Sequence, residues 1–189
     1  LTAPADGTVL RLTAAAGAQP TARPPVAPAG LRVSADTGAP GPSGALPGRL
    51  TRVLSAAELG ALPQDSATGT AHGATVRYTG VRLAAVLRAA GAWPGGPGAT
   101  GERGGLRGAG LARYVVVIGA DGYRAVFALA ELDSATTGGP PPLLALRGDG
   151  APLAADGPLR VVAPADRRPA RWVRGVVAVD VRAAGAGTP

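Results

Sequence analysis

The chain has 189 residues, of which 46% are hydrophobic, and this is enough for one globular domain with a substantial core. It contains no cysteine, which excludes disulfide bonds, thiolate metal sites and cysteine nucleophiles, and its 19 basic residues, all arginine, bring the net charge to +7. A basic surface favours anionic partners, but no aromatic RNA-stacking motif is present and no apolar run approaches the ~18 residues of a membrane span, so we expect neither nucleic acid binding nor membrane insertion.

The first 47 residues differ in composition from the rest. Pro, Gly, Ala, Ser and Thr dominate them, and only the apolar alternations at residues 8–12 and 31–33 indicate strands. We therefore predict a flexible segment over residues 1–47 with at most two edge strands, a domain over residues 48–184 and a tail over residues 185–189. Because the chain does not begin with Met, we expect a processed product or a trimmed fragment. A removed export signal would fit the cysteine-free composition and favours a periplasmic or secreted location, with a cytoplasmic one as the alternative.

The first predicted elements of the domain are a helix, a hairpin and a second helix. In LSAAEL (residues 54–59), Ser55 is a typical N-cap and Glu58 its capping-box partner, which predicts a short helix that ends before Pro63. The Thr-rich segments on either side of His72 predict a hairpin. Thr79 then caps GVRLAAVLRAAG, whose apolar residues recur at helical spacing.

The second half of the chain is predicted to consist mainly of strands. Residues 94–110 form a glycine-rich loop, and two apolar runs flanking Asp121-Gly122 predict a tight hairpin. Further elements are one helical turn at residues 129–133 and strands at residues 143–146, 159–163 and 172–181. The pattern indicates an α+β fold with a mixed or predominantly antiparallel sheet and a few short helices.

Several motifs are better explained by local structure than by chemistry. GPGATG (residues 96–101) matches a dinucleotide fingerprint but follows the end of a helix instead of a strand. RGDG (residues 147–150) is typical of a turn. The single histidine, His72, cannot build a histidine metal cluster, and Glu131 and Asp133 are expected on a solvated helix edge.

Arginine is concentrated in residues 157–182, where six Arg against two Asp give a net charge of +4. Guanidinium groups match phosphate and other oxyanions with paired hydrogen bonds, so two strands holding this tract could present an anion site. The alternative is a basic face exposed to solvent. The two interpretations differ in whether Arg160 and Arg171 come close enough to share one phosphate.

Four segments in order resemble the molybdopterin-binding domain of the sulfite oxidase superfamily: LSAAELGALP, TVRYTGVRLAAVLRAAG, YVVVIGADGYRAVFALAELD and RGDGAPLAADGPLRVVAPADRRPARWVRGVVAVDV. Within that superfamily, the chain looks like the small stand-alone bacterial members described as molybdopterin-binding and oxidoreductase-like. The resemblance covers about residues 50–183. It implies a sulfite-oxidase-type α+β domain, and it implies molybdopterin, the molybdenum cofactor, as the ligand.

The resemblance also implies a set of site residues. In the superfamily, basic and small residues between a Gly-Pro-x-Arg sequence and a Lys/Arg-Trp sequence hold the phosphate and the pterin edge, and the DGY turn lies near the substrate face of the metal. The residues of this chain at those positions are Arg160, Arg167, Arg168, Arg171, Tyr123 and Asp121.

One feature departs from the superfamily pattern. The enzymes bind molybdenum through a cysteine, but the matching segment here, DSATGTAHGA, has none, so no metal ligand or catalytic residue is predicted. Two hypotheses stay open. One is a molybdopterin-dependent oxidoreductase whose metal is held by the pterin, with an undefined redox partner. The other is a non-enzymatic binding domain that keeps the fold and a remnant pocket for a phosphate-bearing anion.

Overall fold

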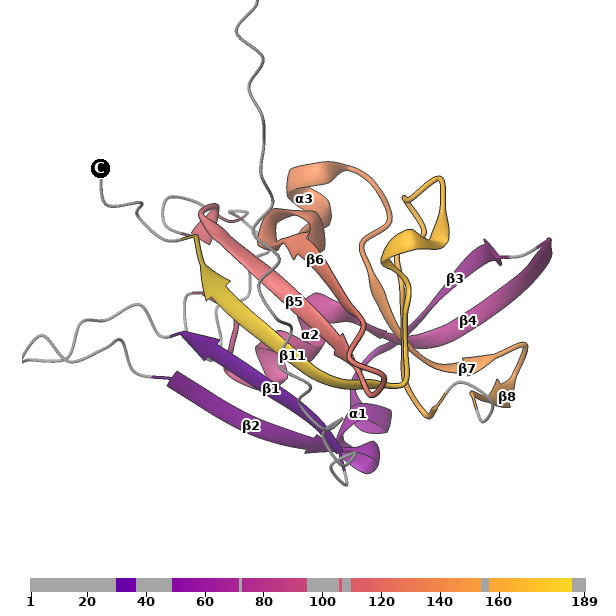
Figure 1. The fold of residues 1–189 in the computed structure, drawn as a ribbon, viewed down its shortest axis with the longest axis horizontal. Helices are drawn as coiled ribbons and strands as arrows, with labels where there is room; N and C mark the ends of the chain where they lie inside the picture. Colours follow the sequence, from indigo (N-terminus) through magenta and orange to yellow (C-terminus); the bar gives the residue numbers. More distant parts are fainter. Residues whose placement is uncertain are drawn as a thin grey trace, which may run out of the picture.

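Two β-sheets and several short helices make up the computed structural model, which describes residues 30–36, 49–71, 73–94, 106, 110–153 and 157–184 (Figure 1). In chain order the elements, with η marking 3-10 helices, are β1 (Gly30–Asp36), β2 (Arg49–Ser55), α1 (Ala56–Ala61), β3 (Gln64–Ala71), β4 (Ala74–Arg82), α2 (Leu83–Ala89), β5 (Arg113–Gly119), β6 (Arg124–Ala128), η2 (Leu129–Leu132), α3 (Ser134–Thr137), β7 (Leu143–Gly148), β8 (Ala151–Pro152), β9 (Arg160–Val162), η3 (Pro169–Arg171), β10 (Val173–Arg174) and β11 (Val176–Ala183). The predicted α+β class with few short helices is confirmed.

The first sheet has five strands in the order β2-β1-β11-β5-β6. β1 and β11 lie side by side and pair in parallel, although almost the whole domain separates them in sequence (Figure 1). The other pairs in this sheet are antiparallel. The prediction of an edge strand at residues 31–33 was therefore wrong, because β1 has a neighbour on each side and buries Leu31 and Val33 in the core. The sheet thus includes residues that precede the predicted boundary at residue 48.

The second sheet has the order β10-β9-β7-β4-β3, with β8 paired to β7. The predicted hairpin is present as β3 and β4, which are antiparallel, while His72 itself lies outside the described residues. The single strand predicted at residues 172–181 is instead two strands, β10 in this sheet and β11 in the other. Gly175, with a φ of 53°, lies between them, so the arginine-rich tract links the two sheets.

The core is filled mainly by aliphatic side chains. Leu83, Val86 and Leu87 of α2 are fully buried in the same cluster as the inner residues of the first sheet. The predicted N-cap of this helix at Thr79 was wrong, because residues as far as Arg82 pair in the second sheet and the helix begins at Leu83. The capping box of α1 is present as predicted, with the Glu58 N–H donating to Ser55 Oγ and the Ser55 N–H donating to Glu58 Oε2.

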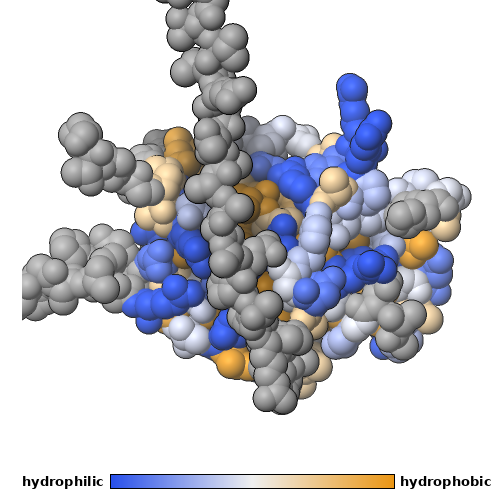
Figure 2. Space-filling model, viewed as in Figure 1, coloured by the Kyte–Doolittle hydropathy of each residue, from blue (hydrophilic) through white to orange (hydrophobic). Residues whose placement is uncertain are grey.

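The surface is hydrophilic around smaller apolar areas on the face shown in Figure 2. Large exposed apolar side chains in the described ranges are Val53, Leu111, Tyr123 and Val126. No described helix has the length and apolar character needed to cross a membrane. The predicted strand at residues 8–12 and the GPGATG motif lie outside the described residues, and the predicted tail at residues 185–189 does too.

An ion pair across β3 and β4 makes stability depend on pH. Arg82 Nε donates to Asp65 Oδ2 over 2.6 Å, and this bond, followed by the Ser66 N–H, holds the pKa of Asp65 below its ordinary value of 3.8. A carboxylate with a lowered pKa contributes its full stabilisation above pH 3.8 and loses it as the pH falls through the lowered pKa.

We therefore expect Asp65→Asn to lower the free energy of unfolding at neutral pH by no more than about 1 kcal/mol, because the Asp65 side chain is 47% exposed. The difference from the unmodified protein should disappear in strong acid. Urea unfolding of both proteins at neutral and acidic pH measures this. A deficit that is as large in acid as at neutral pH would contradict the assignment.

Candidate functional site

A small pocket of about 270 Å³ lies where the arginine-rich tract meets the DGY turn. Two arginines and one carboxylate contribute to it, so its lining has a net positive charge. The lining residues are Asp121, Tyr123, Arg160, Pro169, Ala170, Trp172 and Arg174. The structure thus brings together three of the six residues predicted for cofactor binding: Asp121, Tyr123 and Arg160.

The two arginines of the pocket come from neighbouring strands. Arg160 begins β9 and pairs directly with Arg174 of β10, while the next pair, Val161 and Val173, is buried in the core. Directly opposed residues of antiparallel strands project to the same face. This register therefore sets two guanidinium groups on one side of the sheet, where both can donate to one anion.

Tyr78 orients the Arg160 side chain. Arg160 Nη1 donates to the Tyr78 hydroxyl over 2.8 Å, and the guanidinium carbon lies 5.7 Å from the centroid of the same ring. Tyr78 is only 2% exposed, so its position is set by the core. Hydrogen bonding and the cation–π contact together hold the guanidinium in one orientation at the pocket.

The DGY turn also lines the pocket, through Asp121 and Tyr123. Asp121 Oδ1 accepts the Tyr123 N–H over 2.9 Å, and Gly122 between them has a φ of 84°, a conformation that glycine adopts without strain. The Tyr123 hydroxyl donates to the Ala170 carbonyl, although the ring is half exposed. These bonds connect the β5–β6 turn to η3 and fix the Asp121 carboxylate beside the two arginines.

Trp172 forms an apolar wall of the pocket. Its Nε1–H donates to the Ala163 carbonyl over 3.2 Å, and its ring meets Tyr78 edge to face with 5.9 Å between centroids. Gly69 of β3 lies under the indole, where a Cβ would stand 2.1 Å from the ring. Trp172 and Arg174 were both missed as site residues, although their positions two apart on a predicted strand indicated a shared face.

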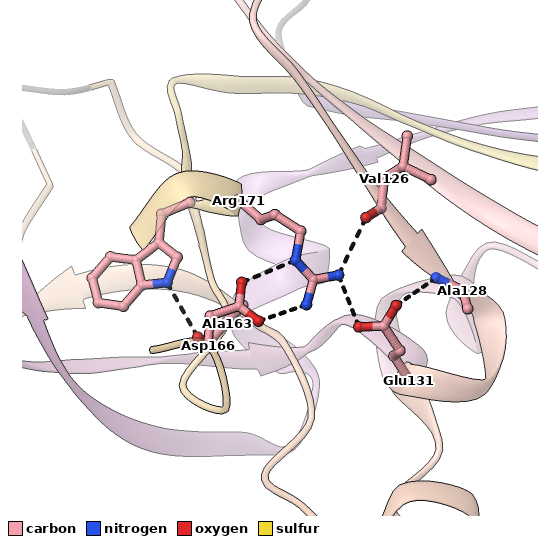
Figure 3. Close-up of polar contacts among 7 residues, drawn as sticks. Val126, Ala128, Glu131, Ala163, Asp166 and Arg171 are labelled. Carbon is pink, nitrogen blue, oxygen red and sulfur yellow. Dashed lines mark hydrogen bonds and ion pairs between the residues drawn. The ribbon is translucent and has the colours of Figure 1, made fainter. Parts of the chain in front are cut away.

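Arg171 does not line this pocket, since two carboxylates hold it elsewhere (Figure 3). Its Nε and Nη2 donate to the two oxygens of Asp166, and its Nη1 donates to Glu131 Oε2 over 2.8 Å. These bonds, chiefly those to Asp166, raise the pKa of Arg171. Glu131 is partly exposed, as expected of a helix edge, but it also accepts hydrogen bonds from Arg171 and from the Ala128 N–H.

The remaining predicted residues are at the surface. Arg167 and Arg168 are exposed on the loop before η3 and do not line the pocket. With Arg171 neutralised by two carboxylates, the structure does not support a phosphate shared by Arg160 and Arg171. The described residues contain no group of three or more His, Cys, Asp or Glu that could hold a metal ion.

An arginine-lined pocket held between a mixed and an antiparallel sheet is typical of a domain that binds an anion or an anionic cofactor. The chain belongs to the family of oxidoreductase molybdopterin-binding domains, whose family model matches residues 52–186. This match confirms the resemblance in sequence and the sulfite-oxidase-type fold. No curated protein matches the chain.

The pocket is a poor fit to the cofactor of this family, a phosphorylated pterin that carries molybdenum. Its volume of about 270 Å³ is close to the lower end of the roughly 300–1,000 Å³ range of ordinary ligand pockets. Arg171, which was predicted from the resemblance to hold the cofactor phosphate, is engaged by Asp166 and Glu131, and the chain has no cysteine for the metal. The described residues therefore suit one oxyanion better than a whole pterin.

Proposed function

We propose that this protein is a non-enzymatic binding domain of the molybdopterin-binding family, in which Arg160 and Arg174 hold a phosphate group, either free or carried by a small molecule. The observation that carries the proposal is the register of β9 and β10, which sets these two arginines directly opposite each other. A phosphate between them would accept charge-assisted hydrogen bonds from both guanidinium groups.

Asp121 gives the pocket a basis for selecting among oxyanions. Its carboxylate can accept a hydrogen bond from a protonated ligand oxygen, but it repels an oxyanion that has no proton to donate. Monohydrogen phosphate carries such a proton at neutral pH, whereas sulfate does not. The pocket is therefore expected to prefer phosphate to sulfate.

The family match favours a second candidate, a molybdopterin-dependent oxidoreductase. When bound, the cofactor would supply redox chemistry at molybdenum, and the chain would have to retain the metal without a thiolate ligand. The engagement of Arg171 by carboxylates argues for the binding domain instead, because it removes one of the two arginines expected to hold the cofactor phosphate.

Titration with inorganic phosphate and with sulfate tests the proposed function. Arg160→Ala is expected to lower phosphate affinity by at least about tenfold, since a hydrogen bond between charged groups contributes roughly 1.5–3 kcal/mol. Arg124→Ala, which removes an exposed arginine of β6 outside the pocket, serves as the charge-matched control and should leave the affinity unchanged. Isothermal titration calorimetry measures each affinity.

The outcomes separate the two candidates. If Arg160→Ala is destabilised, Arg174→Gln, at an exposed position, tests the same pocket. Phosphate affinity that neither variant changes would overturn the proposed site. Stoichiometric molybdenum and pterin in protein made by a cofactor-producing host, with both lost in Arg171→Ala, would overturn the non-enzymatic assignment.

A further inference from the structure

A second and larger cavity, of about 920 Å³, also borders the link between the two sheets at Gly175. Ala120 and Gly175 line this cavity, while their chain neighbours Asp121 and Arg174 line the smaller pocket proposed above to bind phosphate, called the phosphate pocket below. The cavity and the phosphate pocket share no lining residue. The wall of the cavity is largely aliphatic. The larger apolar side chains in it include Leu31, Leu59, Leu146, Leu153, Leu159 and Val176.

The polar side chains of this lining are confined to Gln64, Thr79 and Arg147 among the described residues. Gln64 is occupied by the end of α1, since its Nε2 donates to the carbonyls of Leu59 and Leu62. Thr79 and Arg147 pair across β4 and β7, so they lie together on one side of the cavity. Arg147 is the single charged residue of this described lining.

Arg147 lies at the solvent-exposed edge of the cavity. Its Nη1 donates to the Gly150 carbonyl over 3.2 Å, within the turn that joins β7 to β8. A guanidinium has five N–H donors, and one carbonyl acceptor leaves it able to bind a carboxylate as well. The cavity thus combines an apolar lining with one cation at its edge.

We propose that this cavity binds an aliphatic carboxylic acid, with the hydrocarbon chain against the leucine and valine side chains and the carboxylate at Arg147. The chain leaves water for an apolar wall, and the charge stays at the exposed edge, where solvation is retained. The volume is near the top of the roughly 300–1,000 Å³ range of ligand pockets. At ~30 Å³ for each water-sized atom, it accommodates acids with up to about 30 non-hydrogen atoms.

Gly60 provides a direct test of where the hydrocarbon chain lies. It lines the cavity from α1, and a Cβ added there would meet no atom within 4 Å. Leucine at this position therefore enters the cavity without a clash at the backbone. We expect Gly60→Leu to weaken decanoate binding by at least about tenfold. Ala57→Leu, on the same helix but exposed and outside the cavity, is the matched control and should bind as the unmodified protein does.

Arg147 provides an independent test of where the carboxylate lies. Arg147→Gln should weaken decanoate binding about three- to fivefold, the range of a partly exposed ion pair, and leave decanol binding unchanged. Arg124→Gln is the control for the loss of a surface charge. Each additional CH₂ from octanoate to dodecanoate should raise the affinity by about fourfold.

Displacement of 1-anilinonaphthalene-8-sulfonate fluorescence, checked by calorimetry, measures these affinities on the full chain. Decanoate affinity that Gly60→Leu leaves intact would overturn the proposal, as would equal losses in Gly60→Leu and Ala57→Leu. If Gly60→Leu does not fold, Ala56→Leu fills the same cavity from the same helix. Phosphate binding should be unaffected by every one of these variants, so this proposal and the proposed function can fail separately.

Discussion

Replacement of Gly80 by valine is expected to destabilise the protein by at least about 3 kcal/mol, a large part of the roughly 5–15 kcal/mol that holds a domain of this size together. A Cβ at this position would lie 2.0 Å from the Leu144 carbonyl oxygen and 2.7 Å from the Ala145 Cα. Both atoms belong to the backbone of β7, so no side chain can rotate away to relieve the overlap. The strands themselves would have to separate.

The position of Gly80 makes this separation costly. β4 lies between β3 and β7, and the pairing with β7 shifts register between Thr79 and Gly80. Gly60→Ala is the matched control, since its added Cβ meets open space in α1 and should stabilise by about 0.5–1 kcal/mol through helix propensity. Chemical denaturation compares the variants. An unfolding midpoint for Gly80→Val close to that of the unmodified protein would show that the close approach of the strands is not required.

Replacement of Trp172 by alanine is expected to cost about 3 kcal/mol and to weaken phosphate binding. The indole covers Gly69, meets the edge of Tyr78 and donates to the Ala163 carbonyl, which belongs to a residue only 2% exposed. Its removal leaves a cavity and takes away one of the two hydrogen bonds to the Ala163 carbonyl, which also accepts from the Asp166 N–H. Because Tyr78 orients Arg160, the loss of the tryptophan also loosens the arginine at the phosphate pocket.

Trp172→Phe separates packing from hydrogen bonding. It retains most of the apolar contact with Tyr78 and loses only the bond to Ala163, so we expect a cost of about 1 kcal/mol and nearly unchanged phosphate affinity. Thermal unfolding and phosphate titration are measured on both variants. Full phosphate affinity in a folded Trp172→Ala protein would contradict a positioning role for this side chain.

Local sequence patterns predicted the elements whose formation depends on residues close together in the sequence. The capping box of α1 needs only Ser55 and Glu58, and the β5–β6 hairpin follows from Asp121-Gly122 between two apolar runs. The same patterns misplaced the start of α2, because the pairing of residues 79–82 with β7 outweighs the capping preference of Thr79. Local propensity does not predict this strand pairing, because the β7 partner is more than sixty positions away in the sequence.

The candidate site shows the same division. Asp121, Tyr123 and Arg160 could be selected from the tract and from the family resemblance, and the structure brings them together in one pocket. Arg171 looks equivalent to Arg160 in sequence, but Asp166 and Glu131 engage it. Glu131 lies forty positions before Arg171 in the sequence. Charge composition alone therefore does not predict which arginine forms an ion pair with which carboxylate.

By itself, the amino-acid sequence determined the fold class, the short-range elements and the absence of a cysteine to bind molybdenum, because each follows from residue types and near neighbours. Only the tertiary structure decided the parallel pairing of β1 with β11, the division of the last strand at Gly175 and the partners of each arginine. These depend on contacts between segments far apart in the chain, and their energies are set by burial and packing that no local pattern records.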